Sequence, residues 1–206
     1  FNIKSQMGSD IFIRNFVSIL TPGIILFIII TINGRFTYPV ISMEGNSFWI
    51  IRSAPVSVRV YLNSKIIFLF FPIFIISFLI LGFSYFFLGS PFFFFLFSLM
   101  MLILPEILLI MLALYMGSLY PDFHETDPTK IAINSGGLIF LITAMIVTGI
   151  NMSFYSFFYT GIESIFLLEE LKRAVIGGIL LNLTFNLLLI IILYKKTLRN
   201  LRDIEI

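Results

Sequence analysis

Five long apolar runs, separated by short polar stretches, dominate this chain. They cover residues 16–32, 66–88, 92–120, 131–150 and 174–194. A helix needs about 20 apolar residues to cross the hydrocarbon core of a bilayer. Residues 66–88 contain 18 Leu, Ile or Phe side chains in 23 positions and no charged residue, which favours insertion by roughly 5 kcal/mol or more. The pattern therefore predicts an all-α polytopic membrane bundle with five transmembrane helices.

The amino-acid composition also indicates a membrane protein, and it excludes some kinds of chemistry and of partner. Hydrophobic residues make up 59% of the 206 residues, charged residues make up 12%, and 26 residues are Phe, a balance far from that of soluble domains. The chain has no Cys, which excludes disulfides and thiolate chemistry. A net charge of +2 is too small to indicate a nucleic-acid partner. The lipid bilayer is therefore the first expected partner.

Lys and Arg residues are unevenly divided between the two sets of loops. Nine would lie on one side of the membrane and four on the other: Arg35, Arg52, Arg59, Lys65, Lys130, Lys195, Lys196, Arg199 and Arg202 against Lys4, Arg14, Lys172 and Arg173. The positive-inside rule assigns the richer side to the cytoplasm. Residues 42–65, the loop 121–130 and the C-terminal tail are then cytoplasmic, and residues 151–173 are external.

Five spans place the N-terminus outside, although the chain opens on Phe1 and no signal peptide precedes the first run. An outside N-terminus without a signal peptide is unusual and suggests a preceding span. We therefore expect residues 1–206 to form a single transmembrane domain that is the C-terminal part of a longer protein.

The polar stretch 42–65 predicts a pair of amphipathic cytoplasmic helices. Residues 43–53 alternate apolar and polar groups too quickly for a span, which favours a short helix in the membrane interface. Pro55 should end that helix, because the residue before a proline disfavours the α region. Ser57 is placed to cap a second helix that runs through Lys65 into the next span. A solvated loop with Trp49 anchored at the headgroups explains the same pattern equally well.

This stretch resembles the cytoplasmic segment of ABC-2 type transporter permeases, which docks on an ATPase subunit. The shared pattern is an acidic residue with Gly, a short aromatic or aliphatic helix, then S-x-P-V-S and a Lys about eight residues on. The resemblance implies that an ATPase-coupling interface consists of Glu44, Gly45, Phe48, Trp49, Arg52, Pro55, Val56, Ser57 and Lys65.

A second motif follows the third apolar run. Pro121, Asp122 and Phe123 are followed by Asp127 and Pro128, and then by the pair at 136–137, Gly-Gly. The order is similar to the P-D-F, N-P and G-G stretch of one branch of exporter permeases, with Asp127 where that branch has Asn. The resemblance covers most of the chain and implies that the five runs are the last five of a six-helix core.

The same resemblance implies the partners, the cofactor and the location. The chain contains no G-x-x-x-x-G-K-[ST] loop, so it lacks the cradle for nucleotide phosphates. It would bind no cofactor, and ATP would be bound and hydrolysed by a separate ABC ATPase subunit. A second permease copy or half would complete a dimer in the cytoplasmic membrane of a bacterium or archaeon.

Three polar residues within the apolar runs are candidate functional or packing positions. Glu106 is at the midpoint of residues 92–120, where a charged carboxylate costs about 2.5–3.5 kcal/mol; it is either a proton or substrate site, or a structural acid bonded to another helix. Asn182 and Asn186 are one helical turn apart and share a face, which favours helix packing. The adjacent Gly177 and Gly178 should permit close helix contact.

Two further polar regions have weaker signals. The external residues 151–173 place aromatic side chains at the outer interface and predict a short helix over 163–173. His124 is the only His and lies among Asp122, Glu125 and Asp127. A metal cluster is conceivable there, but a flexible acidic loop is favoured, and we predict no metal site.

Three functions are compatible with these patterns. The exporter permease agrees with both motifs. A non-transporting membrane scaffold or assembly factor is the alternative, since it needs only the helices. An intramembrane enzyme is less favoured, because Ser135 is the nearest candidate nucleophile and the single His lies in a loop, not at the same depth.

Overall fold

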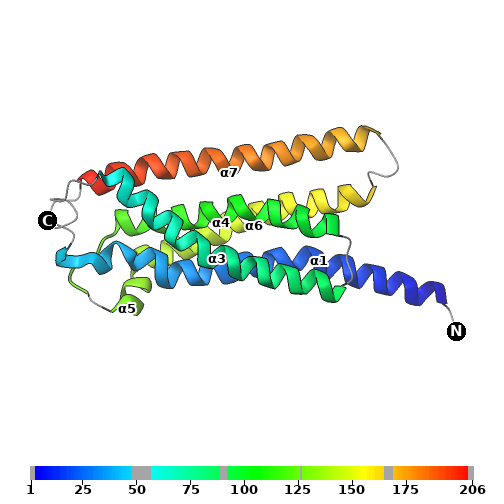
Figure 1. Ribbon diagram of the computed structural model, residues 1–206, viewed down its shortest axis with the longest axis horizontal. Coiled ribbons are helices and arrows are strands. Elements are labelled where there is room, and N and C mark those ends of the chain that lie inside the picture. Colours follow the sequence, from blue (N-terminus) through cyan, green and yellow to red (C-terminus); the bar gives the residue numbers. More distant parts are fainter. Residues whose placement is uncertain (1–2, 48–56, 89–91, 126, 165–168, 204–206) are drawn as a thin grey trace.

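A computed structural model describes residues 3–47, 57–88, 92–125, 127–164 and 169–203 (Figure 1). Every regular element in these ranges is helical, which confirms the predicted all-α class. The α-helices are α1 (Ile3–Ile32), α3 (Val58–Leu88), α4 (Phe92–Leu119), α5 (Pro128–Ala132), α6 (Ser135–Ser164) and α7 (Glu169–Asp203). A π-helix, η1 (Asn33–Thr37), and two 3-10 helices, η2 (Tyr38–Val40) and η3 (Ser42–Ser47), continue α1.

Five of these helical segments are long and apolar enough to cross a membrane, as predicted. They are Phe16–Glu44, Val58–Leu88, Phe94–Leu119, Ser135–Phe157 and Ile179–Asp203. Residues 89–91 lie outside the described ranges, but the two helices that flank them, α3 and α4, pack against each other. The chain is a multi-pass membrane protein.

The predicted span boundaries are wrong at several helix ends. The helix that contains the first span does not stop at Ile32, because η1, η2 and η3 continue the helical path to Ser47. The fourth begins at Ser135 instead of residue 131, since Pro128 starts the separate helix α5. Hydropathy locates the apolar centre of a span, whereas the capping residues locate its ends.

The predicted external segment is also different in the structure. Residues 151–164 continue α6, and residues 169–173 are the first turns of α7, so no separate helix covers 163–173 within the described residues. Asn151 and Tyr155, assigned to the outside, are buried between helices. The mixture of Asn, Ser and aromatic residues lowers the hydropathy of this stretch without ending the helix.

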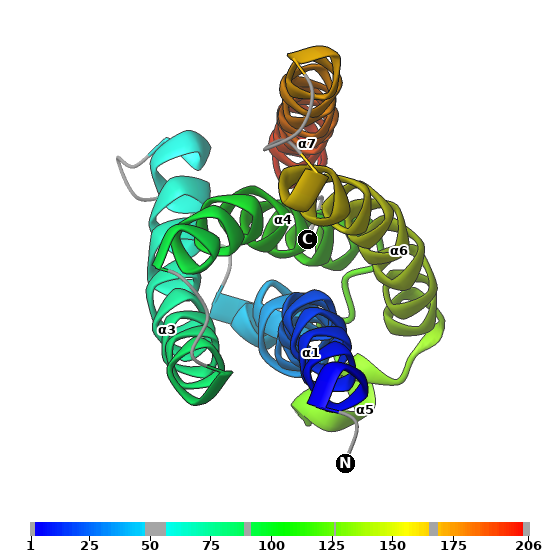
Figure 2. The same cartoon turned by 90° about the vertical axis from the view of Figure 1, so that its right-hand side faces the viewer.

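Helix α4 is the centre of the bundle. It packs against α1, α3, α6 and α7 (Figure 2), and half of its most apolar window is buried, against 11% for α7. The outward faces of α3 and α7 are strongly apolar; Phe68, Phe86 and Phe87 are among the most exposed side chains. A bilayer would cover such faces, because lipid solvates Phe and Leu at no cost.

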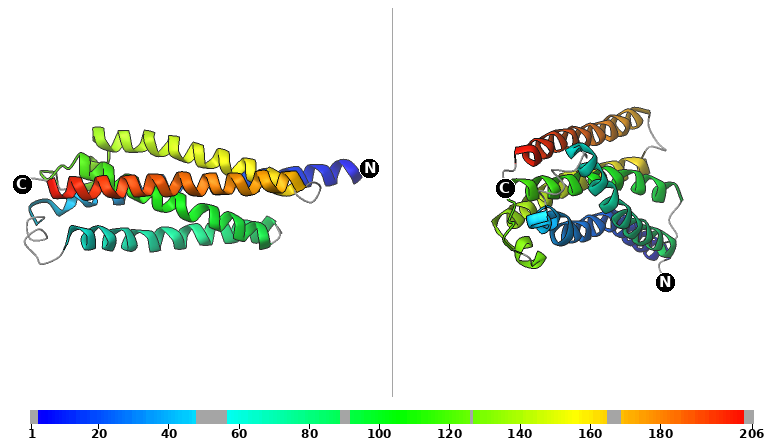
Figure 3. Two further views of the ribbon diagram at one scale, coloured as in Figure 1. Left: turned by 90° about the horizontal axis from the view of Figure 1, so that it is seen from above. Right: turned by 60° about the vertical axis from the view of Figure 1, so that its left-hand side comes forward.

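The helices run roughly along one common axis and alternate in direction (Figure 3). One end of the bundle is called the basic end below. It consists of η1–η3, the start of α3, the whole of α5 and the end of α7. It carries Arg35, Arg59, Lys65, Lys130, Lys195, Lys196, Arg199 and Arg202, whereas Lys4, Arg14, Lys172 and Arg173 lie toward the other end. Arg52 lies outside the described residues. The charge division is therefore present in the fold, and the cytoplasmic orientation of the basic end stays a prediction.

A buried polar cluster joins four helices toward the opposite end. The Ser98 hydroxyl oxygen on α4 lies 2.6 Å from the Tyr85 hydroxyl of α3 and 2.8 Å from that of Tyr155 on α6. Tyr155 also donates to the Ser18 carbonyl of α1, at 3.4 Å. Such bonds stabilise helix contacts in lipid, where apolar surface alone gives no driving force.

Candidate coupling surface and intramembrane polar sites

Glu44 attaches η3 to the first two turns of α3. Its Oε1 lies 2.7 Å from Lys65 Nζ, and its Oε2 accepts a hydrogen bond of 2.5 Å from the Tyr61 hydroxyl. The Lys65 ammonium also lies 5.5 Å from the centre of the Tyr61 ring. The Glu44 and Lys65 side chains are 15% and 28% exposed, so this pair is more shielded than an ordinary surface ion pair. Two predicted coupling residues, Glu44 and Lys65, are therefore brought together.

Ser57 begins the second helix of the predicted pair, as expected. Its hydroxyl oxygen accepts a hydrogen bond of 3.4 Å from the Val60 amide, and α3 starts at Val58. A capping serine satisfies an amide that has no partner within the helix. The first helix is described only as η3, which contains Gly45. The other predicted coupling residues, Phe48, Trp49, Arg52, Pro55 and Val56, lie outside the described residues.

One hydrogen bond joins the two sequence motifs. The Asp122 amide donates to the Ser42 hydroxyl oxygen at 3.1 Å, across 80 residues of sequence. Asp122 Oδ1 in turn accepts from the His124 and Glu125 amides at 3.2 and 3.3 Å, which closes an Asx turn. Phe123 packs against the main hydrophobic core. The loop after α4 is thus tied to η3 and to the core.

Asp127 and Pro128 start α5. Asp127 Oδ1 accepts a hydrogen bond of 2.9 Å from the Thr129 amide, and Pro128 occupies the first helical position. Asp and Asn are about equally good N-caps, and proline is favoured directly after them. The replacement of the expected Asn by Asp127 therefore keeps this local structure. Lys130 Nζ lies 3.3 Å from Glu125 Oε2.

Tyr38 is a buried residue at the basic end that contacts several elements, and neither sequence motif includes it. Its side chain is fully buried, its ring stacks on Phe140, and its hydroxyl donates to Asn134 Oδ1 at 2.6 Å. The same Asn134 oxygen accepts a hydrogen bond of 2.9 Å from the Gly137 amide and so caps α6. Asn134 could have been found, because Asn is a preferred N-cap residue and Asn134 shortly precedes the apolar stretch that starts at Leu138. Nothing in the local sequence marks Tyr38.

Three glycines permit the close packing around Tyr38 and at the start of α6. A Cβ at Gly117 would collide with the Tyr38 carbonyl oxygen, and one at Gly136 with the Tyr38 hydroxyl. A Cβ at Gly137 would collide with the Ala132 carbonyl oxygen. The G-G element of the second motif is therefore explained by close backbone approach at the start of α6.

A family model described as "Putative ATP-binding cassette" matches residues 1–206. The chain belongs to this family. No curated protein and no solved structure matches the chain. The structure is thus that of a multi-pass membrane protein from an ABC-transporter-related family.

In this ABC family member, Glu106 is buried at the centre of α4. Its side chain is 1% exposed, and neither carboxyl oxygen has a hydrogen-bond partner within the described residues. The Ser77 hydroxyl of α3 lies nearby but donates its proton to the Ile73 carbonyl. An unpaired buried carboxyl is costly. The Ser77 hydroxyl is the polar group of another helix that lies beside the carboxyl. Both the structural interpretation and the proton-site hypothesis stay untested.

Replacing Glu106 by Leu should stabilise the protein. An apolar side chain of similar size removes the unpaired polar atoms from the centre of the bundle, and a buried polar group without a partner costs about 1–3 kcal/mol. The check is thermal unfolding of the purified protein in detergent, with Ile103→Leu, a neighbouring change on the same helix, as the control. Unfolding at lower temperature than the unmutated protein would show that the carboxyl has a structural role.

Asn182 and Asn186 join α7 to α6 in this ABC protein. Both side-chain amides donate to Asn151 Oδ1, at 3.2 and 2.8 Å, and all three residues are buried. The predicted helix-packing role is confirmed. The prediction of close contact at Gly177 is wrong, because Gly177 is exposed and a Cβ there would meet no atom within 4 Å.

Proposed function

We propose that the chain is the membrane-spanning permease subunit of an ATP-driven ABC-2 type exporter in a bacterial or archaeal cytoplasmic membrane. Residues 42–65 would couple it to a separate ATPase. The observation that carries the proposal is the hydrogen bond from Asp122 to Ser42, because it joins the two permease-like motifs into one surface at the basic end. Family membership supports the same assignment.

The contacts of η3 suggest how motion would pass from an ATPase into the membrane. A displacement of η3 would act on α3 through Glu44, Tyr61 and Lys65. It would act on the loop after α4 through Ser42 and Asp122. Because both links end at membrane helices, we expect the helices to move as rigid bodies when the ATPase closes.

The nucleotide would be bound outside this chain. The sequence has no phosphate-binding G-x-x-x-x-G-K-[ST] loop. The ATPase subunit would therefore hydrolyse ATP, and the permease would form the path of the substrate across the membrane. We propose that a second copy of this chain, or a different permease half, pairs with it and completes the substrate path.

Deletion of residues 48–52 tests the coupling role. The protein is co-expressed with its candidate ATPase, and complex formation is measured by co-purification at equal permease yield. The deletion removes Phe48 and Trp49, and buried aromatic anchors dominate binding energy. We expect recovery of the ATPase to fall at least about tenfold, which corresponds to ~1.4 kcal/mol.

The control is Phe86→Ala, which removes an exposed aromatic side chain near the far end of α3 and should leave recovery unchanged. Full ATPase recovery with the deletion would contradict the proposed docking surface. A complex that forms but never shows ATP-dependent substrate movement in vesicles would favour the scaffold alternative.

A further inference from the structure

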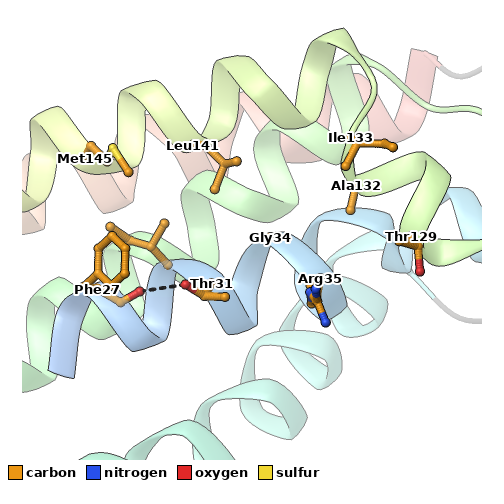
Figure 4. Close-up of a pocket in the computed structure, with 10 residues that line it drawn as sticks. Phe27, Thr31, Gly34, Arg35, Thr129, Ala132, Ile133, Leu141 and Met145 are labelled. Atoms are coloured by element: carbon orange, nitrogen blue, oxygen red, sulfur yellow. Dashed lines mark hydrogen bonds between the residues drawn. The ribbon is translucent and has the colours of Figure 1, made fainter. Parts of the chain in front are cut away.

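A cavity of about 300 Å³ lies between α1, α5 and α6 near the basic end. Figure 4 shows Phe27 and Thr31 of α1 on one side and Leu141 and Met145 of α6 on the other. Phe27 and Met145 are each more than half exposed. The cavity is therefore apolar along its length and open toward the surface that the bilayer would cover.

Among the described residues, Arg35 is the only charged one that lines the cavity. Its side chain is exposed, and no acidic side chain among the described residues forms an ion pair with it. Lys65 and Lys130 at the same end each have a carboxylate partner. An arginine left without a carboxylate at the end of an apolar span is available to an anion from outside the chain.

The backbone that carries Arg35 is held in place. Arg35 lies in the π-helix η1, whose buried residues Asn33 and Thr37 are joined by a hydrogen bond of 2.6 Å from the Thr37 hydroxyl to Asn33 Oδ1. Short π-helical turns occur often at functional sites. The guanidinium group is thus attached to a fixed turn beside the cavity.

We propose that this cavity binds one anionic phospholipid from the leaflet at the basic end. The phosphate binds the Arg35 guanidinium, and an acyl chain lies along Phe27, Leu141 and Met145. A lipid matches both properties of the site, because one molecule carries a phosphate at the interface and an apolar chain directly below it. Basic pockets between membrane helices recognise anionic headgroups by this combination of charge and depth.

Native mass spectrometry of the purified protein tests the proposal, with phosphatidylglycerol and phosphatidylcholine titrated separately. We expect the anionic lipid to bind more tightly. Arg35→Gln should weaken phosphatidylglycerol binding about fivefold, the effect of one interfacial cation. Arg59→Gln removes another exposed cation of the basic end that does not line the cavity, and it should change binding less than twofold.

The acyl chain is tested by filling the cavity. Met145→Trp should reduce phosphatidylglycerol binding, whereas Ile142→Trp, at an exposed position of α6 outside the cavity lining, should not. Unchanged elution in size-exclusion chromatography shows that each variant is folded. The proposal is overturned if the two lipids bind equally or if Arg35→Gln and Arg59→Gln lose equal affinity. It is also overturned if Met145→Trp binds phosphatidylglycerol fully, or if millimolar inorganic phosphate displaces the lipid.

Discussion

Glu44→Lys should weaken binding of the ATPase subunit about tenfold, and the additional change Lys65→Glu should restore most of it. The single change places two ammonium groups where the structure has an ion pair of 2.7 Å. Because Glu44 and Lys65 are partly exposed, the expected cost lies between those of surface and buried pairs, about 1–3 kcal/mol. The repulsion should displace η3 from α3 and misplace the residues that follow it.

The measurement is the Kd of the candidate ATPase subunit for this protein in lipid nanodiscs. Lys65→Glu alone should be as harmful as Glu44→Lys, since either change creates a like-charged pair. Arg199→Glu, which affects an exposed ion pair on α7, is the matched charge reversal. If the double variant binds as poorly as the single ones, the ion pair does not position the docking surface.

Gly137→Ala should lower the stability of the protein by about 2–4 kcal/mol. The new Cβ would collide with the Ala132 carbonyl oxygen. A backbone atom cannot rotate away as a side chain does, so the turn between α5 and α6 would have to shift. That shift would disturb the hydrogen bonds of Asn134 with Tyr38 and with residue 137. We expect a fall in Tm of roughly 5–15 °C by thermal unfolding in detergent.

Gly149→Ala is the control on the same helix. A Cβ at Gly149 would meet no atom within 4 Å, and Ala is favoured over Gly inside a helix by about 1 kcal/mol. Its Tm should therefore stay the same or rise. Equal Tm values for Gly137→Ala and the unmutated protein would show that the backbone at the start of α6 tolerates a side chain.

Some features of the site could be predicted because they depend on neighbours in sequence. The caps formed by Ser57 and Asp127 are local, since each bonds an amide two or three residues ahead. Lys65 and Tyr61 are one turn apart on α3, so they share a face by helical geometry alone. The partner that joins them, Glu44, belongs to another element, and no local pattern indicates that contact.

Other features depend on how distant elements meet. Tyr38 reaches Asn134 across 96 residues, and Asn151 reaches Asn186 across 35. Asn151 was assigned to the outside because polar residues around it lower the hydropathy, yet its partners on α7 satisfy it within the bundle. The same hydropathy pattern cannot tell whether a polar side chain meets water or another helix.

The sequence by itself determined that this is an all-α membrane protein with five spans and a basic end, because lipid requires long apolar helices and charge cannot stay in the hydrocarbon. It also indicated both motifs of the proposed coupling surface. Only the tertiary structure decided that these motifs meet through Ser42 and Asp122 and that Tyr38 is their buried neighbour. It also decided that Arg35 lies beside a cavity with no ion-pair partner among the described residues. Those contacts depend on which faces of the helices pack together, and apolar faces of similar composition do not specify that choice in advance.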